Sequence, residues 1–537
     1  MKQATIDVLV VGAGFGGIYE LYSFREMGLS TLLVDKASNV GGTWFWNTYP
    51  GAMSDTESYL YQYSWDKDLL RTYPWKNHYL KQAEVLAYLD HVVDKNDLRK
   101  DMRLSTELVA ATWDEDSNVW LVQLQSEDGE ISHLSTRYLI TALGLLSTPI
   151  YPDIPGLPSF GGRIVHTAAW TPDIEVKNKR VGVIGCGSTG IQVITELSKK
   201  VASLVSFQRR PQYSVPSGDK PINPEYRKWV NENYDQIWNG VWNSNTGFGI
   251  PESQVPFASV APEKREQVFE ELWQQGNGFR FMFGGFSDIT TNKEANEAAA
   301  QFIKNKISQI VKDPETARKL TPKDAYARRP LCDGGYYQCF NRENVSVVSL
   351  DETPIKAIVP EGIETMDGTI HDLDLIIFAT GFDAVEGSYN RIRIQGRNGR
   401  TLQDHWATQG PTSFMGVALP GFPNLFTLMG PQGPFSNNPP CIELEVMFHR
   451  GLIEYAEKVR RESGQVVEVT PEAEAAWVEH CEQIAEGSLF KETASWIFGN
   501  NVSGKQIALR FYFGGLKAYR QEIDKVVTSR YSAFQTV

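Results

Sequence analysis

Cysteine is scarce in this sequence, and the few cysteines are not spaced for pairing or for metal binding. There are five in 537 residues, and no two of them form a CxxC pair. This excludes the dithiol of a disulfide reductase and the ligand spacing of a zinc site, so we predict no metal. The odd number indicates free thiols, and we expect a reducing, cytoplasmic location. The five are Cys186, Cys332, Cys339, Cys441 and Cys481.

Long apolar runs and basic blocks are absent as well. The sequence has no stretch of about eighteen uninterrupted apolar residues, the usual minimum for a membrane-spanning helix. The net charge is -13, and no cluster of Lys and Arg occurs of the kind that binds phosphate backbones. We therefore expect neither a membrane nor a nucleic acid as a partner.

A glycine-rich motif near the N-terminus predicts a first dinucleotide site. The strand-like run Ile6–Val11 leads into Gly12-x-Gly14-x-x-Gly17, which opens a predicted helix to about Met27. This is the setting that a Rossmann fingerprint needs, and a glycine-rich turn without a ligand is the alternative. Asp35 ends the next strand, where an acid accepts hydrogen bonds from ribose hydroxyls and repels a 2'-phosphate. The motif thus favours FAD or NAD over NADP.

A second copy of the pattern predicts a site of different preference. The strand Arg180–Ile184 is followed by a glycine motif and a helix, but the strand Ser203–Phe207 leads to Gln208 rather than an acid. Arg209 and Arg210 come next, and guanidinium groups suit a 2'-phosphate, so this site is predicted to take NADPH. A solvated basic strand end is the alternative for this pair. The motif consists of Gly185, Gly187, Ser188, Thr189 and Gly190.

An FAD site and an NADPH site on one chain indicate hydride transfer from nicotinamide to flavin. Without a CxxC pair, molecular oxygen is the remaining common acceptor of the electrons.

The second half of the chain has a different pattern of expected elements. Between 218 and 323 the pattern is helical, notably in 262–275 and 293–311, and strands are expected again at 345–348 and 373–378. The tail should contain a strand and turn at 425–430 and helices over 443–461 and 471–487.

Between the two glycine motifs lies a further pattern, Phe160-x-Gly162-x-x-x-His166-x-x-x-Trp170. It resembles the signature of the Baeyer-Villiger monooxygenases. In that family Pro or Asp comes directly after the tryptophan, whereas here Thr171 comes first and Pro172 follows it. The resemblance covers nearly the whole chain and is closest to the cyclohexanone-oxidising members. It includes the stretches 42–44, 49–52, 329–333 and 495–499.

The resemblance implies an α/β fold with two Rossmann-like domains, one for FAD and one for NADP, and a helical insert. The FAD-binding domain is expected from 1–145 and 384–537, the latter with the C-terminal region. The NADP-binding domain is expected from 150–217 and 330–383, and the helical subdomain from 218–329. The implied reaction inserts one atom of O2 beside a ketone carbonyl through a C4a-peroxyflavin, giving an ester or lactone.

The resemblance also implies roles for individual residues. Arg329 matches the cation that stabilises the reactive oxygen species, and Asp55 the carboxylate that orients this arginine and borders the flavin. His166 and Trp170 are expected at the hinge between domains, with a purely structural histidine as the alternative. Further expected contacts are Gly42, Thr43 and Trp44 with FAD, and Arg209, Arg328 and Trp496 with NADP.

Six residues fall where the cyclohexanone-oxidising relatives line their ketone pocket. Asn438 departs from the pattern, because relatives carry an aliphatic residue there, and it is expected to influence selectivity. Cyclic ketones such as cyclohexanone are the expected substrates, with sulfoxidation as a side activity and a monomer or weak oligomer as the assembly. The six are Leu143, Phe248, Phe279, Phe435, Ser436 and Asn438.

Two other functions fit parts of the sequence. An N- or S-oxygenating flavin monooxygenase would share both dinucleotide motifs, but the 160–170 signature together with Arg329 and Asp55 favours ketone oxidation. A flavoprotein that binds both nucleotides without turnover is the other alternative. The complete set of Asp55, Arg329 and Trp496 argues against it.

Overall fold

The computed structural model describes residues 4–502 and 504–537, and its first sheet is built from both ends of the chain. β1 and β2 pair in parallel, as predicted for the first motif, and β8 pairs in parallel with the other side of β1. β22, from the C-terminal part, pairs with β8, and β21 extends the edge at β6. The strands are β1 (Ala4–Val11), β2 (Thr31–Val34), β5 (Met102–Arg103), β6 (Thr106–Asp114), β7 (Val119–Ser126), β8 (Ile131–Thr141), β21 (Arg393–Gln395) and β22 (Leu425–Thr427).

The second sheet is entirely parallel, in the order β10-β19-β11-β12-β15. Its central strands are buried apolar runs, as expected for a sheet covered on both faces. The strands predicted at 180–184, 203–207, 345–348 and 373–378 all occur in it. They are β10 (Arg163–His166), β11 (Arg180–Ile184), β12 (Ser203–Gln208), β15 (Val345–Ser349) and β19 (Leu375–Phe378).

A helix follows the first strand of each glycine motif. α1 (Phe15–Glu26) is buried over most of its surface and packs against α14 (Asn438–Ser463), while α5 (Ser188–Leu197) covers the second sheet. The sequence placed the start of α14 at Glu443, five residues too late. Pro439 lies in the first turn, where its missing N–H costs no hydrogen bond, so the helix begins earlier.

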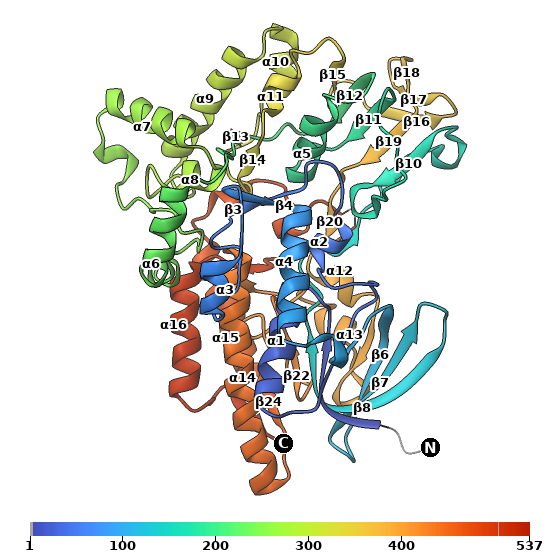
Figure 1. Cartoon of the computed structure of the whole chain (residues 1–537), viewed down its shortest axis with the longest axis vertical. Coiled ribbons are helices and arrows are strands. Elements are labelled where there is room, and N and C mark those ends of the chain that lie inside the picture. The colour runs from blue at the N-terminus through green and yellow to red at the C-terminus, as the bar shows by residue number, and fades with distance from the viewer. Residues whose placement is uncertain (1–3, 503) are drawn as a thin grey trace.

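The predicted helical insert is confirmed and forms the upper left of Figure 1. Within it, Phe269, Phe281 and Phe302 form an aromatic cluster with ring centroids 5.5 to 5.7 Å apart. The insert returns to the second sheet through β14 (Leu331–Asp333), which pairs with β13 (Ser214–Pro216). The helices are α6 (Pro224–Trp242), α7 (Pro262–Gln275), α8 (Gly278–Phe283), α9 (Lys293–Ile310) and α10 (Pro314–Leu320).

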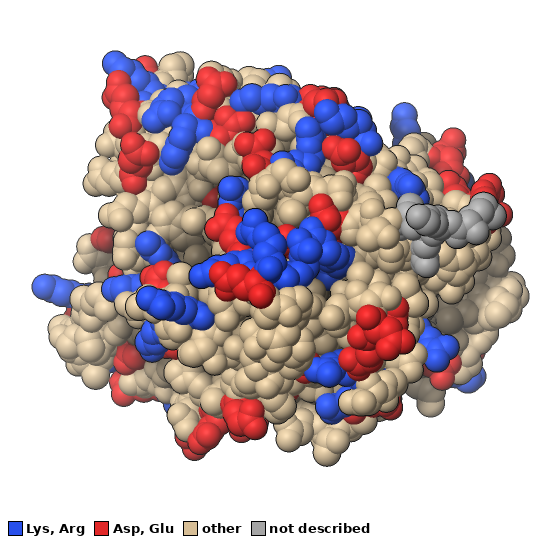
Figure 2. Space-filling model, turned by 90° about the horizontal axis from the view of Figure 1, so that it is seen from below, with Lys and Arg blue, Asp and Glu red and all other residues tan. Residues whose placement is uncertain are grey.

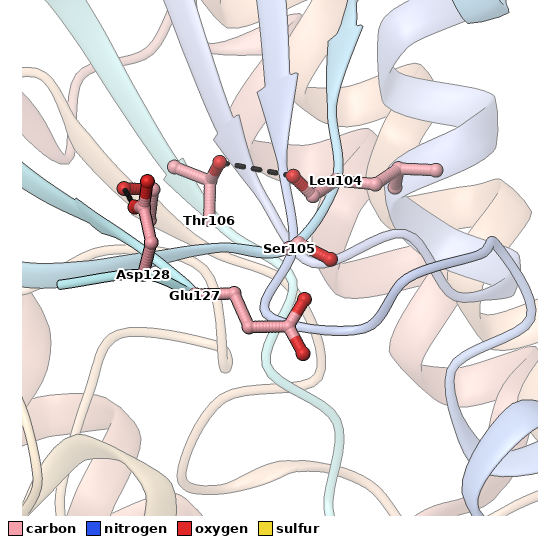
Figure 3. Close-up of a pocket in the computed structure, with 6 residues that line it drawn as sticks. Leu104, Ser105, Thr106, Glu127 and Asp128 are labelled. Carbon is pink, nitrogen blue, oxygen red and sulfur yellow. Dashed lines mark hydrogen bonds between the residues drawn. The ribbon is translucent and has the colours of Figure 1, made fainter. Parts of the chain in front are cut away.

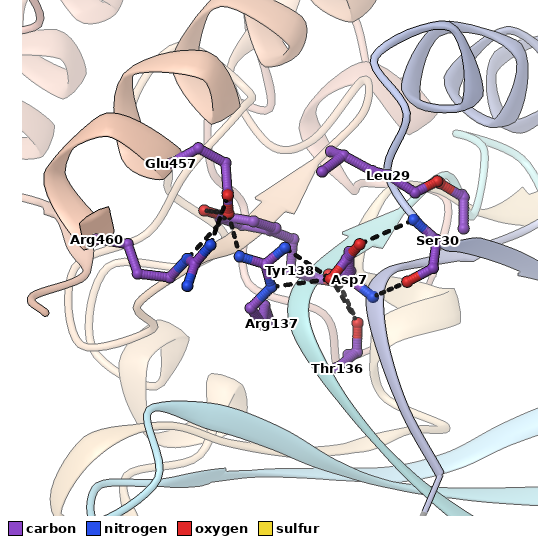
Figure 4. Close-up of polar contacts among 9 residues, drawn as sticks. Asp7, Leu29, Ser30, Thr136, Arg137, Tyr138, Glu457 and Arg460 are labelled. Atoms are coloured by element: carbon purple, nitrogen blue, oxygen red, sulfur yellow. Dashed lines mark hydrogen bonds and ion pairs between the residues drawn. The ribbon is translucent and has the colours of Figure 1, made fainter.

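An ionic network joins the two ends of the chain at the first sheet (Figure 4). Arg137 on β8 donates to Asp7 Oδ1 on β1 at 2.6 Å and pairs with Glu457 on α14. Tyr138 Oη and Arg460 also donate to Glu457, at 2.9 and 2.8 Å. Although burial opposes it, these donors hold the pKa of Glu457 at about 2. The network therefore fixes α14 on the first sheet.

The distribution of charged side chains, apolar helices and cysteines can be compared with what the composition predicted. Figure 2 shows acidic and basic side chains interspersed over the face seen from below. In the described parts of the chain, no helix is both long and apolar enough to cross a membrane. All five cysteines are buried and unpaired.

Candidate active site

The first glycine motif forms a tight turn between β1 and α1. Gly12 has φ +112°, and a Cβ there would lie 2.3 Å from the carbonyl oxygen of Ala142. A Cβ on Gly17 would lie 1.8 Å from the oxygen of Gly12, so the helix can approach the strand only with glycine at this position. Gly14 precedes α1, and its backbone faces Gly42. The N-terminal N–H groups of α1 are thus available for a pyrophosphate.

Asp35 lies at the end of β2 and holds this turn in place. Its carboxylate accepts from the backbone N–H of Ala13 at 2.6 Å and of Ala37 at 2.8 Å. Its carbonyl accepts from Thr106 N at 2.8 Å, beside a surface hollow lined by Leu104, Ser105, Thr106, Ser126, Glu127 and Asp128 (Figure 3). Each carboxylate oxygen has a second lone pair for a ribose hydroxyl. The hollow itself contains none of the predicted site residues.

Thr43 and Trp44 begin a short helix, α2 (Thr43–Trp46), and Gly42 precedes this helix beside the first glycine turn. A Cβ on Gly42 would lie 2.7 Å from Cα of Gly14, so the two backbones are in contact. Trp44 Nε1 donates to Tyr61 Oη at 3.0 Å. The predicted FAD contacts are therefore brought together by two separate segments.

The second glycine motif repeats this geometry between β11 and α5. Gly187 precedes α5, whose first residues are Ser188 and Thr189. Gly185 packs against the backbone of Ala379 and Gly190 against that of Gly185. A Cβ on Gly187 would meet no atom within 4 Å, which leaves room in front of this helix end for a phosphate group.

The two arginines predicted to bind the 2'-phosphate lie near the second glycine turn. Arg209 is exposed directly after β12, while Gln208 is buried as the last residue of that strand. Arg328 pairs with Asp324, and its buried Nε has no partner in the part of the chain that the structure describes. Both guanidinium groups are close enough to Cys186 to oppose the rise in the pKa of its buried thiol.

Asp55 and Arg329 form a direct ion pair, with Arg329 Nη2 2.7 Å from Asp55 Oδ2. The Asp55 side chain on β3 (Met53–Glu57) is 4% exposed, whereas that of Arg329 is 31% exposed and can face a ligand. Burial alone would lower the pKa of Arg329, but the adjacent carboxylate raises it above its usual value. The site therefore holds a permanent cation. The Arg329 guanidinium also lies 5.3 Å from the centroid of Phe279.

Residues that the sequence did not single out hold Asp55 in position. Asn277, with φ +73°, donates to the Asp55 carbonyl at 3.0 Å and caps α8, which carries Phe279. Tyr49 Oη donates to Gln192 Oε1 on α5 at 2.8 Å, and Gln192 Nε2 donates to Met53 O at 3.1 Å. The Asn277-Gly278 pair is a local signal for a turn, but its contact with Asp55 depends on the tertiary fold.

The 160–170 signature begins at the edge of the second sheet, and its last residue contacts the segment around Thr48. His166 ends β10, and its buried Nδ1 accepts from Ala168 N at 3.1 Å. Burial lowers the pKa of His166 to about 4, so the ring is neutral. The carbonyl of Trp170 accepts from Thr48 Oγ1 at 2.9 Å, next to Tyr49. Gly162 lies against Phe160 and the Asp374 carbonyl.

The structure brings only part of the predicted pocket together. Phe248 and Phe279 stack with centroids 3.9 Å apart, and Phe435 lies 6.4 Å from Trp496. Ser436 donates to Asn245 O at 2.7 Å. Leu143 instead packs against the core under β6–β8, and Asn438 is exposed as the first residue of α14. The buried amide is its neighbour, Asn437.

The residues present fit a flavin and a nicotinamide dinucleotide. Both glycine turns offer helix N-termini, and only the first has an acid at the end of its second strand. Among the described residues, no group donates to the buried Oδ1 of Asp55, so this oxygen lacks a hydrogen-bond donor that a bound ligand would supply.

Known proteins share this arrangement. Residues 5–215 match the family model for flavin-binding monooxygenase-like proteins. The chain is 49% identical to a phenazine N-monooxygenase from Lysobacter antibioticus, over 98% of this chain and 96% of that protein. It is 48% identical to a Baeyer-Villiger monooxygenase from Pseudooceanicola batsensis, over 99% and 96%. The NADP+-bound cyclohexanone monooxygenase from Rhodococcus sp. Phi1 superposes with a TM-score of 0.96 at 48% identity, over 100% of this chain and 99% of that chain.

Proposed function

Since the chain belongs to the Baeyer-Villiger monooxygenases and uses FAD and NADPH, we propose that it converts cyclic ketones to lactones with O2. FAD, when bound and reduced by NADPH, would activate O2 for the reaction. Arg329 and Asp55 are the proposed catalytic pair. Lactone formation from cyclohexanone-sized ketones is the main activity, and sulfoxidation is a side activity.

The single observation that carries the proposal is the Asp55–Arg329 pair. A nucleophilic oxygen species must remain negatively charged, and a fixed cation in a partly dry site stabilises that charge better than water does. The 2.7 Å contact fixes one side of the guanidinium, while the remaining exposed surface can face the reacting oxygen. A guanidinium also keeps its proton when desolvated, which a lysine in the same place need not do.

The proposed substrate class follows from the residues around this cation. The stacked rings of Phe248 and Phe279 offer an apolar surface beside Arg329. Such a wall suits an alicyclic ring whose carbonyl points toward the charge. Small cyclic ketones therefore fit better than acyclic, charged ones.

A second candidate is N-oxygenation of an aromatic heterocycle. It is favoured by one observation, the 49% identity to a phenazine N-monooxygenase over nearly the whole chain. Stacked aromatic side chains also suit a flat heterocycle. This activity needs no anionic nucleophile, so it depends less on Arg329.

The test is turnover of the FAD-loaded enzyme with NADPH on cyclohexanone, cyclopentanone, phenazine and thioanisole in parallel. The proposal predicts that cyclohexanone gives ε-caprolactone at the highest kcat/KM, with some sulfoxide from thioanisole. Phenazine N-oxide as the dominant product, with no lactone from either ketone, would replace the proposal by the second candidate.

A further inference from the structure

Four charged side chains meet in the interior where the chain leaves the second sheet. Asp383 and Glu386 are the acidic members, and Lys505 and Arg510 are the basic members, of what is called the charge cluster below. Arg510 Nε and Nη2 donate to the two oxygens of Glu386 at 3.0 and 2.5 Å. Lys505 Nζ lies 2.9 Å from Glu386 Oε1 and also pairs with Asp383. Arg510 is fully buried, so its charge is stable only while these partners remain.

The rest of the Arg510 guanidinium organises the segment that carries Trp496. Nη1 donates to Ala508 O and Nη2 to Gln506 O, both at 3.0 Å. A Cβ on Gly499 would lie 2.4 Å from Nη1, so the turn that begins at Trp496 closes directly over the guanidinium. Only a planar fork with several N–H donors can serve this carboxylate and these carbonyls together.

The residue after Arg510 contacts the candidate active site, and the backbone of Arg510 is itself held in place. Its carbonyl accepts from Gln432 N at 2.8 Å. The next residue, Phe511, has its ring centroid 5.5 Å from Trp496 and 5.4 Å from Phe435. Displacing Arg510 would therefore move both the proposed NADP contact and a wall of the proposed pocket.

The acidic members of the charge cluster lie on either side of a residue with an unusual backbone conformation. Val385, just before Glu386, has φ +62°, a conformation that β-branched residues rarely adopt. Its N–H donates to Leu145 O at 2.8 Å, at the crossing between the two sheets. Strained residues of this kind persist where the surrounding structure requires one geometry.

We infer that Arg510 is a positioning residue which, through Glu386, fixes Trp496 and Phe511 on the connection between the two sheets. NADP binding then depends on the forked guanidinium and not on its charge alone. The inference rests on the proposed function in one respect, the placing of Trp496 at the NADP site.

The test uses the full-length, FAD-loaded enzyme with Arg510→Lys, which keeps the charge and removes the fork. Arg318→Lys is the matched control, because Arg318 makes a forked pair with Glu352 on the exposed surface. Two quantities are measured: the Kd for NADP+ from the flavin difference spectrum, and the rate of chymotrypsin cleavage after Trp496 and Phe498. We expect Arg510→Lys to weaken NADP+ by about tenfold and to speed cleavage at these two sites severalfold.

Glu386→Gln provides a second, nearly isosteric variant, and it should reproduce both effects at unchanged FAD content. NADP+ affinity and cleavage rates within twofold of wild type in both variants would overturn the inference. Neither measurement requires oxygenation of a substrate. A wild-type enzyme that binds NADP+ but makes no lactone would therefore contradict the proposed function and leave this inference standing.

Discussion

Arg329 Nη2 lies 2.7 Å from Asp55 Oδ2, although 274 positions separate the two residues in the chain. β3 brings Asp55 from the N-terminal part, and the connection from α10 to β14 brings Arg329 from the end of the helical insert. The contact therefore exists only when the insert is docked against the N-terminal part. It makes the cation of the site dependent on the assembled fold.

We predict that Arg329→Ala lowers the rate of lactone formation by about 10²–10³-fold, the usual cost of removing one electrostatic stabiliser. Arg329→Lys should recover only part of this loss, since lysine cannot hold Asp55 with a planar fork. Anaerobic reduction of the flavin by NADPH, followed at its visible absorbance, should change only a few-fold. Arg280→Lys is the control, because Arg280 also pairs with a buried acid, Glu57, at 3.0 Å. Equal losses in Arg280→Lys and Arg329→Lys would contradict the assignment.

Arg209→Ala should raise the KM for NADPH by about ten- to thirtyfold, as expected for the loss of a charge-assisted contact with the 2'-phosphate. The KM for NADH should hardly change, since NADH has no such phosphate. Arg180→Ala, at the exposed start of β11 and at the opposite end of this strand from the glycine turn, serves as the control. Steady-state kinetics with both nucleotides measure the effect, and a parallel rise for NADH would show that Arg209 acts only on the fold.

Two adjacent asparagines should behave differently. The family resemblance alone places Asn438 at the pocket, and on that basis Asn438→Leu should alter product ratios on substituted cyclic ketones more than it alters peroxide release. Its effect on stability should be small, because the structure leaves the side chain exposed. Asn437→Leu removes two buried hydrogen bonds, to Thr56 Oγ1 at 2.8 Å and Gly247 O at 3.0 Å, and should lower the thermal midpoint. Unchanged product ratios with Asn438→Leu would remove this residue from the pocket.

The stability of the enzyme should fall as the pH rises through neutrality. Burial raises the pKa of Glu445 to about 8 and that of Glu443 to about 7, from an ordinary value of 4.5. A raised folded-state pKa stabilises the protein fully below the unfolded pKa, and this contribution is lost as the pH rises through the folded pKa. The urea midpoint should therefore decrease between about pH 5 and about pH 9.

Glu445→Gln should flatten this dependence, because an amide does not titrate. Glu457→Gln is the control: the pKa of Glu457 is held at about 2, so its contribution is constant over the same range and disappears only in acid. If Glu445→Gln leaves the slope unchanged, burial of this carboxyl does not govern the pH dependence.

The sequence alone could predict features that depend on neighbouring residues. The turn from Gly12 to Gly17 and Asp35 lie within one βαβ unit, and glycine positions with strand and helix patterns identify them locally. The long helices α7, α9 and α15 (Pro471–Ala485) were found for the same reason. The start of α14 was missed because a proline in a first turn looks like a break.

Contacts between distant segments could not be predicted in this way. Asp55 and Arg329 were proposed only through a family resemblance, since nothing near either residue indicates an ion pair. Asn277 and Arg510 were not proposed, because an asparagine in a turn and an arginine between apolar residues have many uses. Asn438 was proposed as a pocket residue from its place in the family pattern, yet the structure buries the amide of Asn437 instead.

Turnover of cyclohexanone with NADPH under ¹⁸O2 is the decisive experiment for the proposed lactone-forming reaction. We expect ε-caprolactone carrying one ¹⁸O atom, formed in near-equal amount to the NADPH consumed, and loss of this product in Arg329→Ala. Consumption of NADPH with all of the reduced oxygen recovered as hydrogen peroxide, and no labelled lactone, would contradict it.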